Sequence, residues 1–242
     1  MKAALLLDAL GTLVELEPPV APLRRELRER FGVEVSAAEA GAALRAEIAF
    51  YRAHHDEASD RARLADLRRR SAEALRDALP PVARALPIEP LTDALLAALR
   101  FRPFPEVPAV LRGARERGVR LVVVSNWDVS LHDVLAETDL APLLDGVVTS
   151  AEVGHSKPDP AIFARALAVA DAAAHEAIHV GDSVAHDVAG ALASGVEPLL
   201  LVRDGTAADA APPPGVRTIA TLRPVLELLD PDARRRSVSF TP

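Results

Sequence analysis

The chain has 242 residues, a formal net charge of −7 and no cysteine, and half of its residues are hydrophobic although only 3% are aromatic. This length can bury a full core, either as one domain with an insertion or as two small domains. The negative charge argues against a general nucleic-acid or anionic-membrane surface, and the lack of cysteine excludes disulfides and thiolate metal sites. Because the sequence has no apolar run of 18 residues and no signal-peptide pattern, we expect a soluble, cytoplasmic protein.

The first 99 residues combine one apolar run with a long helical pattern. Residues 3–7 are apolar and end at a polar residue and a glycine, which predicts a buried strand. From residue 21 to 99, apolar residues recur at helical spacing with charges between them, which predicts three or four helices. Ser36 and Glu39 have the spacing of a capping box. Because no strand follows for over 100 residues, too long for one crossover, we interpret residues 16–99 as an inserted helical cap.

Beyond Pro105 the pattern changes to alternating helices and strands. Such alternation indicates a parallel sheet covered on both faces, so the predicted fold class is α/β, a Rossmann-like core that carries the helical cap. We assign residues 1–15 and 100–230 to the core and residues 231–242 to a C-terminal tail. The predicted helices cover about 107–117, 161–170, 184–194 and 221–229, and the predicted strands 119–124, 147–149, 177–180, 198–202 and 217–219.

Polar side chains stand just past three of these strands, at Asp8, at Ser125 with Asn126, and at Asp182. In an open parallel sheet, ligands bind outside the carboxyl ends of the strands. Each residue alone could be a helix cap or a turn residue, but their joint occurrence is hard to obtain by chance. Lys157 lies between the second and third groups, and it is one of only two lysines in an arginine-rich chain.

At these positions the chain resembles the haloacid dehalogenase-like hydrolase superfamily. The resemblance covers about residues 1–15 and 100–205, and the helical insertion is similar to a cap of that superfamily. It implies an aspartate nucleophile, Mg²⁺ and a phosphate or halide substrate. The matching stretches are Asp8-Ala-Leu-Gly-Thr12, Ser125-Asn126, Lys157-Pro-Asp-Pro160, and Gly181-Asp-Ser183 with Asp187 and Gly190-Ala191.

The resemblance implies a nucleophile and a metal site. Asp8 would attack phosphorus and form an aspartyl-phosphate, while the positive charge of Lys157 offsets the negative charges that meet there. Mg²⁺ prefers oxygen ligands, which the carboxylates of Asp8 and Asp182 and the backbone carbonyl of Leu10 would supply.

The same resemblance implies contacts to the phosphate. The hydroxyls of Thr12 and Ser125 and the backbone N–H of Asn126 would donate hydrogen bonds to phosphate oxygens. Asp187 would orient Lys157 or a metal-bound water. His179, inside a predicted strand, is expected in the core. Trp127 and Asp128 are expected either to face the cap or to begin the next helix.

The chain departs from the superfamily's phosphatases at position 10. In those phosphatases a second aspartate, two residues after the nucleophile, serves as general acid and then as general base. This chain has Leu10 at that position. The carbonyl of Leu10 can still hold the metal, but acid–base catalysis should be impaired, typically by about 10²–10⁴-fold. A phosphonoacetaldehyde hydrolase also lacks this acid but needs a cap lysine, and the predicted cap has none.

We therefore expect a Mg²⁺-dependent phosphatase of a small phosphorylated compound, slowed by the missing acid. A 2-haloacid dehalogenase and a non-catalytic phosphate-binding protein remain alternatives. No nucleic-acid or membrane partner is expected, and the oligomeric state and the substrate are not predicted.

Overall fold

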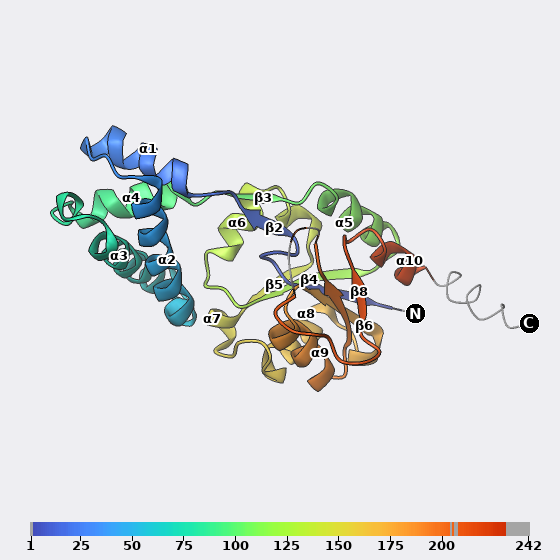
Figure 1. Cartoon of the computed structure of the whole chain (residues 1–242). Helices are drawn as coiled ribbons and strands as arrows, with labels where there is room; N and C mark the ends of the chain where they lie inside the picture. Colours follow the sequence, from blue (N-terminus) through green and yellow to red (C-terminus); the bar gives the residue numbers. More distant parts are fainter. Residues whose placement is uncertain (1, 204, 206–207, 231–242) are drawn as a thin grey trace, which may run out of the picture. The chain divides into compact units, whose positions relative to one another are not determined.

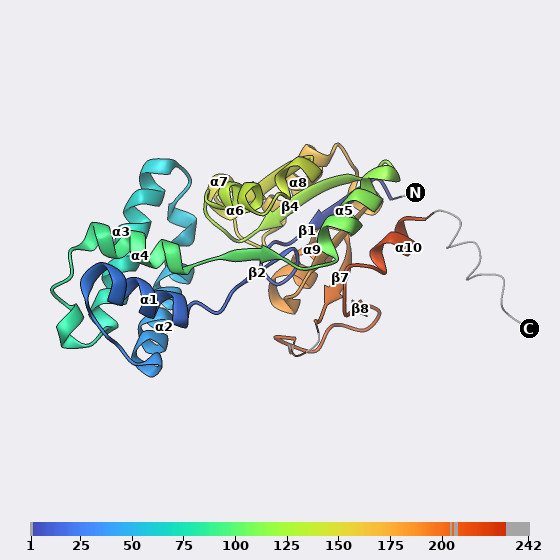
Figure 2. The ribbon, with the colours of Figure 1, turned by 90° about the horizontal axis from the view of Figure 1, so that it is seen from above.

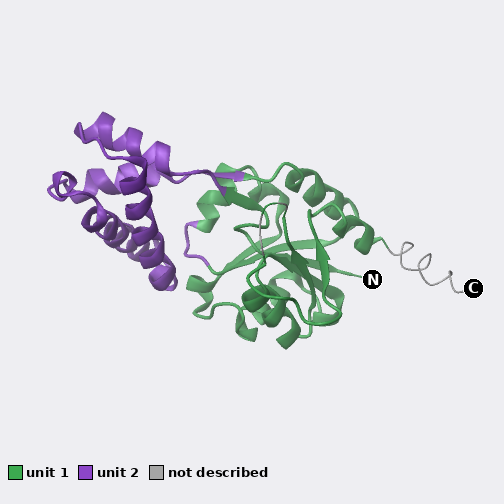
Figure 3. Cartoon of the chain, viewed as in Figure 1, with its two compact units in different colours: residues 1–15, 103–126, 131–242 green, residues 16–102, 127–130 purple. Residues whose placement is uncertain are grey.

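The computed structural model describes residues 2–203, 205 and 208–230 (Figure 1). The predicted tail at 231–242 lies outside this part. Among the described residues, no helix has the length and apolar character needed to cross a membrane. The chain divides into two compact units, one of residues 1–15, 103–126 and 131–242 and one of residues 16–102 and 127–130 (Figure 3).

Unit 1 contains a six-stranded sheet in which the described strand pairs are parallel. The strand order is β5-β4-β1-β6-β7-β8. The central strand is β1 (Ala4–Leu7), fully buried, as expected for a strand covered on both faces. The other strands are β4 (Arg120–Ser125), β5 (Gly146–Thr149), β6 (Ala177–Gly181), β7 (Glu197–Leu201) and β8 (Arg217–Ile219).

Helices cover both faces of this sheet (Figure 1). On one face, Ala4 and Leu6 of β1 join Val122 and Val124 of β4 in a core cluster with α8 (Pro160–Ala170) and α9 (Ala189–Ala193). On the other face lie α5 (Val107–Glu116), which contacts β4, and α10 (Val225–Leu229), which contacts α5. The remaining helices of unit 1 are α6 (Leu131–Glu137) and α7 (Ser150–Val153), with 3₁₀ turns at 141–143 and 174–176. The predicted α/β fold class is confirmed.

Unit 2 consists of four helices around an aliphatic core. They are α1 (Val20–Phe31), α2 (Ala37–His54), α3 (Arg61–Ala78) and α4 (Ile88–Ala98), with 3₁₀ turns at 55–57 and 81–83. Leucines at helical spacing, such as Leu23 with Leu27 and Leu91 with Leu95, fill the core, which explains why a sequence poor in aromatics still folds there. The predicted capping box is present at the start of α2, where Ser36 and Glu39 exchange hydrogen bonds.

Several elements of the structure differ from the sequence prediction. Strands β2 (Val14–Leu16) and β3 (Phe101–Pro103) were not predicted, and they pair as a separate two-stranded sheet, side by side in both views (Figures 1 and 2). The predicted helix at 184–194 begins as a π-helical turn, η5 (Val184–Val188), before α9. Residues 127–130, assigned to the core from the sequence, group with unit 2. There the Val129 N–H donates to the Ala58 carbonyl at 3.1 Å, and Asp128 accepts a hydrogen bond from Tyr51 Oη at 2.9 Å.

Candidate functional site

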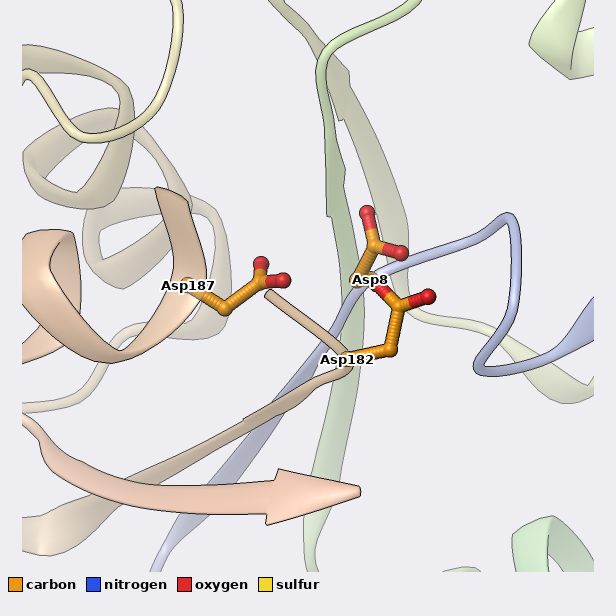
Figure 4. Close-up of side chains that lie close together, drawn as sticks. All are labelled: Asp8, Asp182 and Asp187. Carbon is orange, nitrogen blue, oxygen red and sulfur yellow. The ribbon is translucent and has the colours of Figure 1, made fainter. Parts of the chain in front are cut away.

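The register of the sheet brings the predicted site residues to one edge. Leu7 of β1 lies beside Val123 of β4 and Val180 of β6, so the carboxyl ends of these three strands lie at the same edge of the sheet. Asp8 follows β1 directly, and its backbone N–H donates to the Val180 carbonyl at 2.9 Å. Asp182 follows β6. Figure 4 shows the carboxylates of Asp8 and Asp182 close together, with that of Asp187 turned toward them.

The Asp8 carboxylate is held by two donors from other segments. Lys157 Nζ donates to Asp8 Oδ1 at 2.7 Å, and the Ser125 hydroxyl donates to the same oxygen at 3.0 Å. All three side chains are buried. Because Oδ1 accepts both bonds, Oδ2 is left for another partner. The Ser125 hydroxyl donates to Asp8 in this structure, and its predicted contact to a phosphate stays a prediction.

Lys157 also forms an ion pair with Asp187, whose Oδ1 lies 2.6 Å from Nζ. Burial alone would lower the pKa of Lys157, but the charges of Asp187 and Asp8 outweigh it and raise that pKa above its ordinary value. Burial likewise opposes ionisation of Asp187, but Lys157 and a hydrogen bond from His179 hold the pKa of Asp187 well below its usual range. The ammonium group therefore stays charged while buried, as an anion site requires.

His179 is a site residue that the sequence analysis assigned only to the core. It is buried in β6 as expected, yet its Nε2 lies 2.9 Å from Asp187 Oδ1, which makes Nε2 the donor to an ionised carboxylate. Phe163 packs edge-on against the imidazole ring. A histidine within an otherwise apolar strand was the signal available in the sequence, because a buried imidazole needs a polar partner.

Asn126 positions Lys157 rather than pointing to a ligand. Its side-chain Nδ2 donates to the Lys157 carbonyl at 3.0 Å, and its Oδ1 accepts from the Lys157 backbone N–H at 2.7 Å. The ring Nδ1 of His186 lies 3.1 Å from the same carbonyl. The end of β4 thus fixes the backbone of the segment that carries the lysine. The predicted contact between a phosphate and the backbone N–H of Asn126 stays a prediction.

Two glycines allow the carboxylates to lie so close to the backbone. Gly11 has φ +81°, in the left-handed region that favours glycine, and a Cβ there would overlap the Asp182 carboxylate. A Cβ at Gly181 would overlap the carboxylate of Asp187. Both glycines therefore keep open the space in which the acidic side chains meet.

The acidic cluster fits a hard divalent cation. Ligand atoms of Asp8, Asp182 and Asp187 all lie within 4.8 Å of one another. Burial raises the pKa of Asp8 above its ordinary value, although the positive charge of Lys157 acts in the opposite direction. Burial and the charges of Asp8 and Asp187 raise the pKa of Asp182 to about 7. Three carboxylates against one ammonium group leave an excess of negative charge that oxygen-ligated Mg²⁺ would offset.

Leu10 and Thr12 have less defined roles. Leu10 is 41% exposed, and it forms a β-bridge with Val14 within the turn that follows Asp8. Thr12 is fully buried, and its hydroxyl has no hydrogen-bond partner among the residues that the structure describes. The metal contact of the Leu10 carbonyl and the phosphate contact of Thr12 stay predictions.

Comparison with known proteins gives a family match over most of the chain. A family model described as haloacid dehalogenase-like hydrolase matches residues 2–195. Among curated proteins, the mouse haloacid dehalogenase-like hydrolase domain-containing protein 3 is 39% identical over 125 residues, which cover 50% of each chain. A phosphoserine phosphatase of Thermus thermophilus is 36% identical over 127 residues, 52% of this chain and 51% of that protein. The matches thus span about half the length of these curated relatives.

Solved structures with the same fold include a 2-haloacid dehalogenase from Pseudomonas syringae. It superposes with a TM-score of 0.66 and 24% sequence identity, covering 98% of this chain and 100% of that one. This likeness extends through the helical segment as well as the sheet, and at this identity it supports the fold alone.

Proposed function

The chain belongs to the haloacid dehalogenase-like hydrolase family, and we propose that it is a Mg²⁺-dependent phosphatase of a small phosphorylated compound. The observation that carries this proposal is the buried Lys157, held between Asp8 and Asp187 beside the third carboxylate of Asp182. A relative named as a phosphatase supports the phosphate ester as substrate class. The cytoplasmic location and the lack of a nucleic-acid partner stay predictions.

In the proposed reaction Asp8 is the nucleophile. Its Oδ2, free of the two donors on Oδ1, forms a bond to phosphorus while the bond from phosphorus to the leaving oxygen breaks. Lys157 neutralises charge on the carboxylate and on the incoming phosphate. A water oxygen then forms a bond to phosphorus while the bond from phosphorus to Asp8 Oδ2 breaks. The proton that the water loses passes to solvent, because Leu10 offers no base, and inorganic phosphate leaves with the Asp8 carboxylate restored. Asp8 and Asp182 would hold Mg²⁺, which when bound stabilises negative charge on the phosphate.

Leu10 restricts the leaving group. A hydrocarbon side chain cannot protonate a departing alkoxide, so that proton must come from water. The nitrophenolate of an aryl phosphate and the carboxylate of an acyl phosphate depart as stable anions and need no proton. We therefore propose that aryl or acyl phosphates are hydrolysed faster than sugar phosphates.

The same residue favours one alternative, a 2-haloacid dehalogenase. A halide ion leaves without a proton, so Leu10 would be no handicap when Asp8 attacks carbon. Against this stands the acidic pair of Asp8 and Asp182, because a site for a negatively charged haloacid gains nothing from extra carboxylates. Metal dependence separates the two reactions.

The test is a phosphate-release assay on para-nitrophenyl phosphate and acetyl phosphate, with and without Mg²⁺, beside a chloride-release assay on 2-chloropropionate. We expect phosphate release that needs Mg²⁺ and that Asp8→Asn abolishes, because an amide oxygen is a far weaker nucleophile. The matched control is Asp145→Asn, which removes a carboxylate paired with Arg120 on the same unit. Metal-independent chloride release would favour the dehalogenase, and full activity of Asp8→Asn would refute both reactions.

A further inference from the structure

Arg203 is a largely buried cation of unit 1 that the proposed reaction does not use. It stands two residues after β7, and its side chain is 12% exposed. Its guanidinium carbon lies 3.4 Å from the ring centroid of Phe104, so the planar group stacks on an aromatic face. Placing an arginine here costs desolvation that only specific partners can offset.

These partners are two backbone carbonyls in the turn that follows Asp8 and one buried carboxylate. Arg203 Nε donates to the Gly11 carbonyl at 3.0 Å, and Nη2 donates to the Thr12 carbonyl at 2.8 Å. Nη1 donates to Glu106 Oε1 at 2.7 Å. Burial by itself raises the pKa of Glu106, but the bond from Arg203 is the main factor that brings it below its ordinary value. The guanidinium fork thus joins three chain segments.

The turn at residues 9–14 is the part of the site that this fork holds. Its backbone closes on Ala9, whose carbonyl accepts hydrogen bonds from the N–H groups of Thr12, Leu13 and Val14. On its other side Gly11 lies so close to the Asp182 carboxylate that a Cβ would overlap it. Any displacement of the Gly11 peptide therefore changes the space between Asp8 and Asp182.

We propose that Arg203 is a positioning residue, which fixes the turn at residues 9–14 against Asp182 and so sets the spacing of the two carboxylates. The role depends on the geometry of the fork and not on charge alone, because a single ammonium nitrogen cannot bond all three oxygens in the directions that a planar guanidinium reaches. A test of this role by Mg²⁺ affinity rests on the proposed function, whereas a test by hydrogen exchange of the backbone amides does not.

The first experiment measures hydrogen exchange of the amides of Thr12, Leu13 and Val14 in the metal-free protein. Arg203→Met and Arg203→Lys should each speed this exchange by about tenfold or more, since each loses charge-assisted hydrogen bonds to the turn. The matched control is Arg120→Met, which removes an arginine paired with Asp145 at the opposite end of the sheet and should leave the turn unchanged. If a folded Arg203→Met protein exchanged these amides at the wild-type rate, the proposal would be overturned. If Arg203→Lys did so, the claim that the planar guanidinium geometry is needed would be overturned.

The second experiment titrates Mg²⁺ into the same proteins by calorimetry, with thermal unfolding measured in parallel. Supporting residues of a metal site typically change affinity by 10–100-fold, so we expect the dissociation constant of both Arg203 variants to rise at least about tenfold. A residue with a merely structural role would lower the unfolding temperature and leave the affinity of the folded protein unchanged, which would also overturn the proposal. If the wild-type protein binds no Mg²⁺, the proposed function fails while the exchange data still decide the role of Arg203.

The wild-type protein offers a check that needs no variant, should Arg203→Met and Arg203→Lys both fail to fold. By nuclear magnetic resonance, the Nε–H of Arg203 should exchange slowly with solvent, because it is bonded to the Gly11 carbonyl. The Nε–H groups of exposed arginines such as Arg120 provide the fast-exchanging reference. Fast exchange at Arg203 would show that the fork does not hold the turn.

Discussion

At the scale of single residues, position 10 determines which leaving groups the proposed phosphatase can expel. Leu10 is 41% exposed, so a carboxylate at this position would be solvated rather than forced into the core. We expect Leu10→Asp to speed hydrolysis of alkyl phosphates by up to about 10²–10⁴-fold and to change aryl phosphate hydrolysis much less. The measurement is kcat/KM on both substrate types at saturating Mg²⁺, with Leu10→Asn as the control that cannot donate a strongly acidic proton. Efficient wild-type turnover of an alkyl phosphate would mean that another residue supplies the proton.

A second residue, Glu47 of α2, should make stability depend on pH. Burial raises the pKa of Glu47 to about 7, well above the ordinary value near 4.3. Between these values the folded chain holds a proton that the unfolded chain has lost, so stability falls as pH rises from about 4.3 to 7 and then levels off.

The expected size of this effect is on the order of 2 kcal/mol between pH 5 and 8. Glu47→Gln keeps the shape and removes the titration of this group, so its free energy of unfolding should fall less than that of the wild type by this amount, while the contribution of Asp182 is common to both proteins. Urea unfolding of both proteins at the two pH values measures the difference. Equal pH dependence in the two proteins would show that Glu47 ionises freely in the folded chain.

At the scale of elements, the start of α2 depends on the capping box. The Ser36 hydroxyl accepts from the Glu39 N–H at 3.2 Å, and the Ser36 N–H donates to Glu39 Oε2 at 2.7 Å. Ser36→Ala should lower the free energy of unfolding by about 1 kcal/mol, because it leaves a helix N–H without its acceptor. Ser36→Asp, which can still cap, should lose far less. Chemical unfolding of the three proteins is the measurement, and equal stability of wild type and Ser36→Ala would contradict this view.

At the scale of the whole molecule, the candidate site belongs to one unit. Asp8, Ser125, Lys157 and Asp182 all lie in unit 1. The Glu17 N–H donates to the Arg100 carbonyl at 2.8 Å, so a short Gly-Ser turn could join these positions after deletion of residues 18–99. We expect the shortened chain to fold and to bind Mg²⁺ with an affinity near that of the full chain. A folded deletion variant that has lost Mg²⁺ binding would show that the site needs residues of unit 2.

The sequence by itself determined the family, the α/β fold class and the positions of the polar groups at the strand ends. It could do so because a strand buried on both faces reads as an apolar run, and because Asp8 and Asp182 end such runs at Leu7 and Gly181. Ser125 closes β4 in the same way. The roles of these residues in catalysis remain predictions.

Only the tertiary structure decided which partners these groups have. It showed that the Ser125 hydroxyl donates to Asp8, that the Asn126 side chain holds the Lys157 backbone, and that His179 supports Asp187. It also brought Arg203 to the turn after Asp8, 192 positions earlier in the chain. The physical reason is that a hydrogen bond depends on direction and distance between side chains remote in sequence, whereas hydrophobic periodicity is a local property that the order of residues already carries.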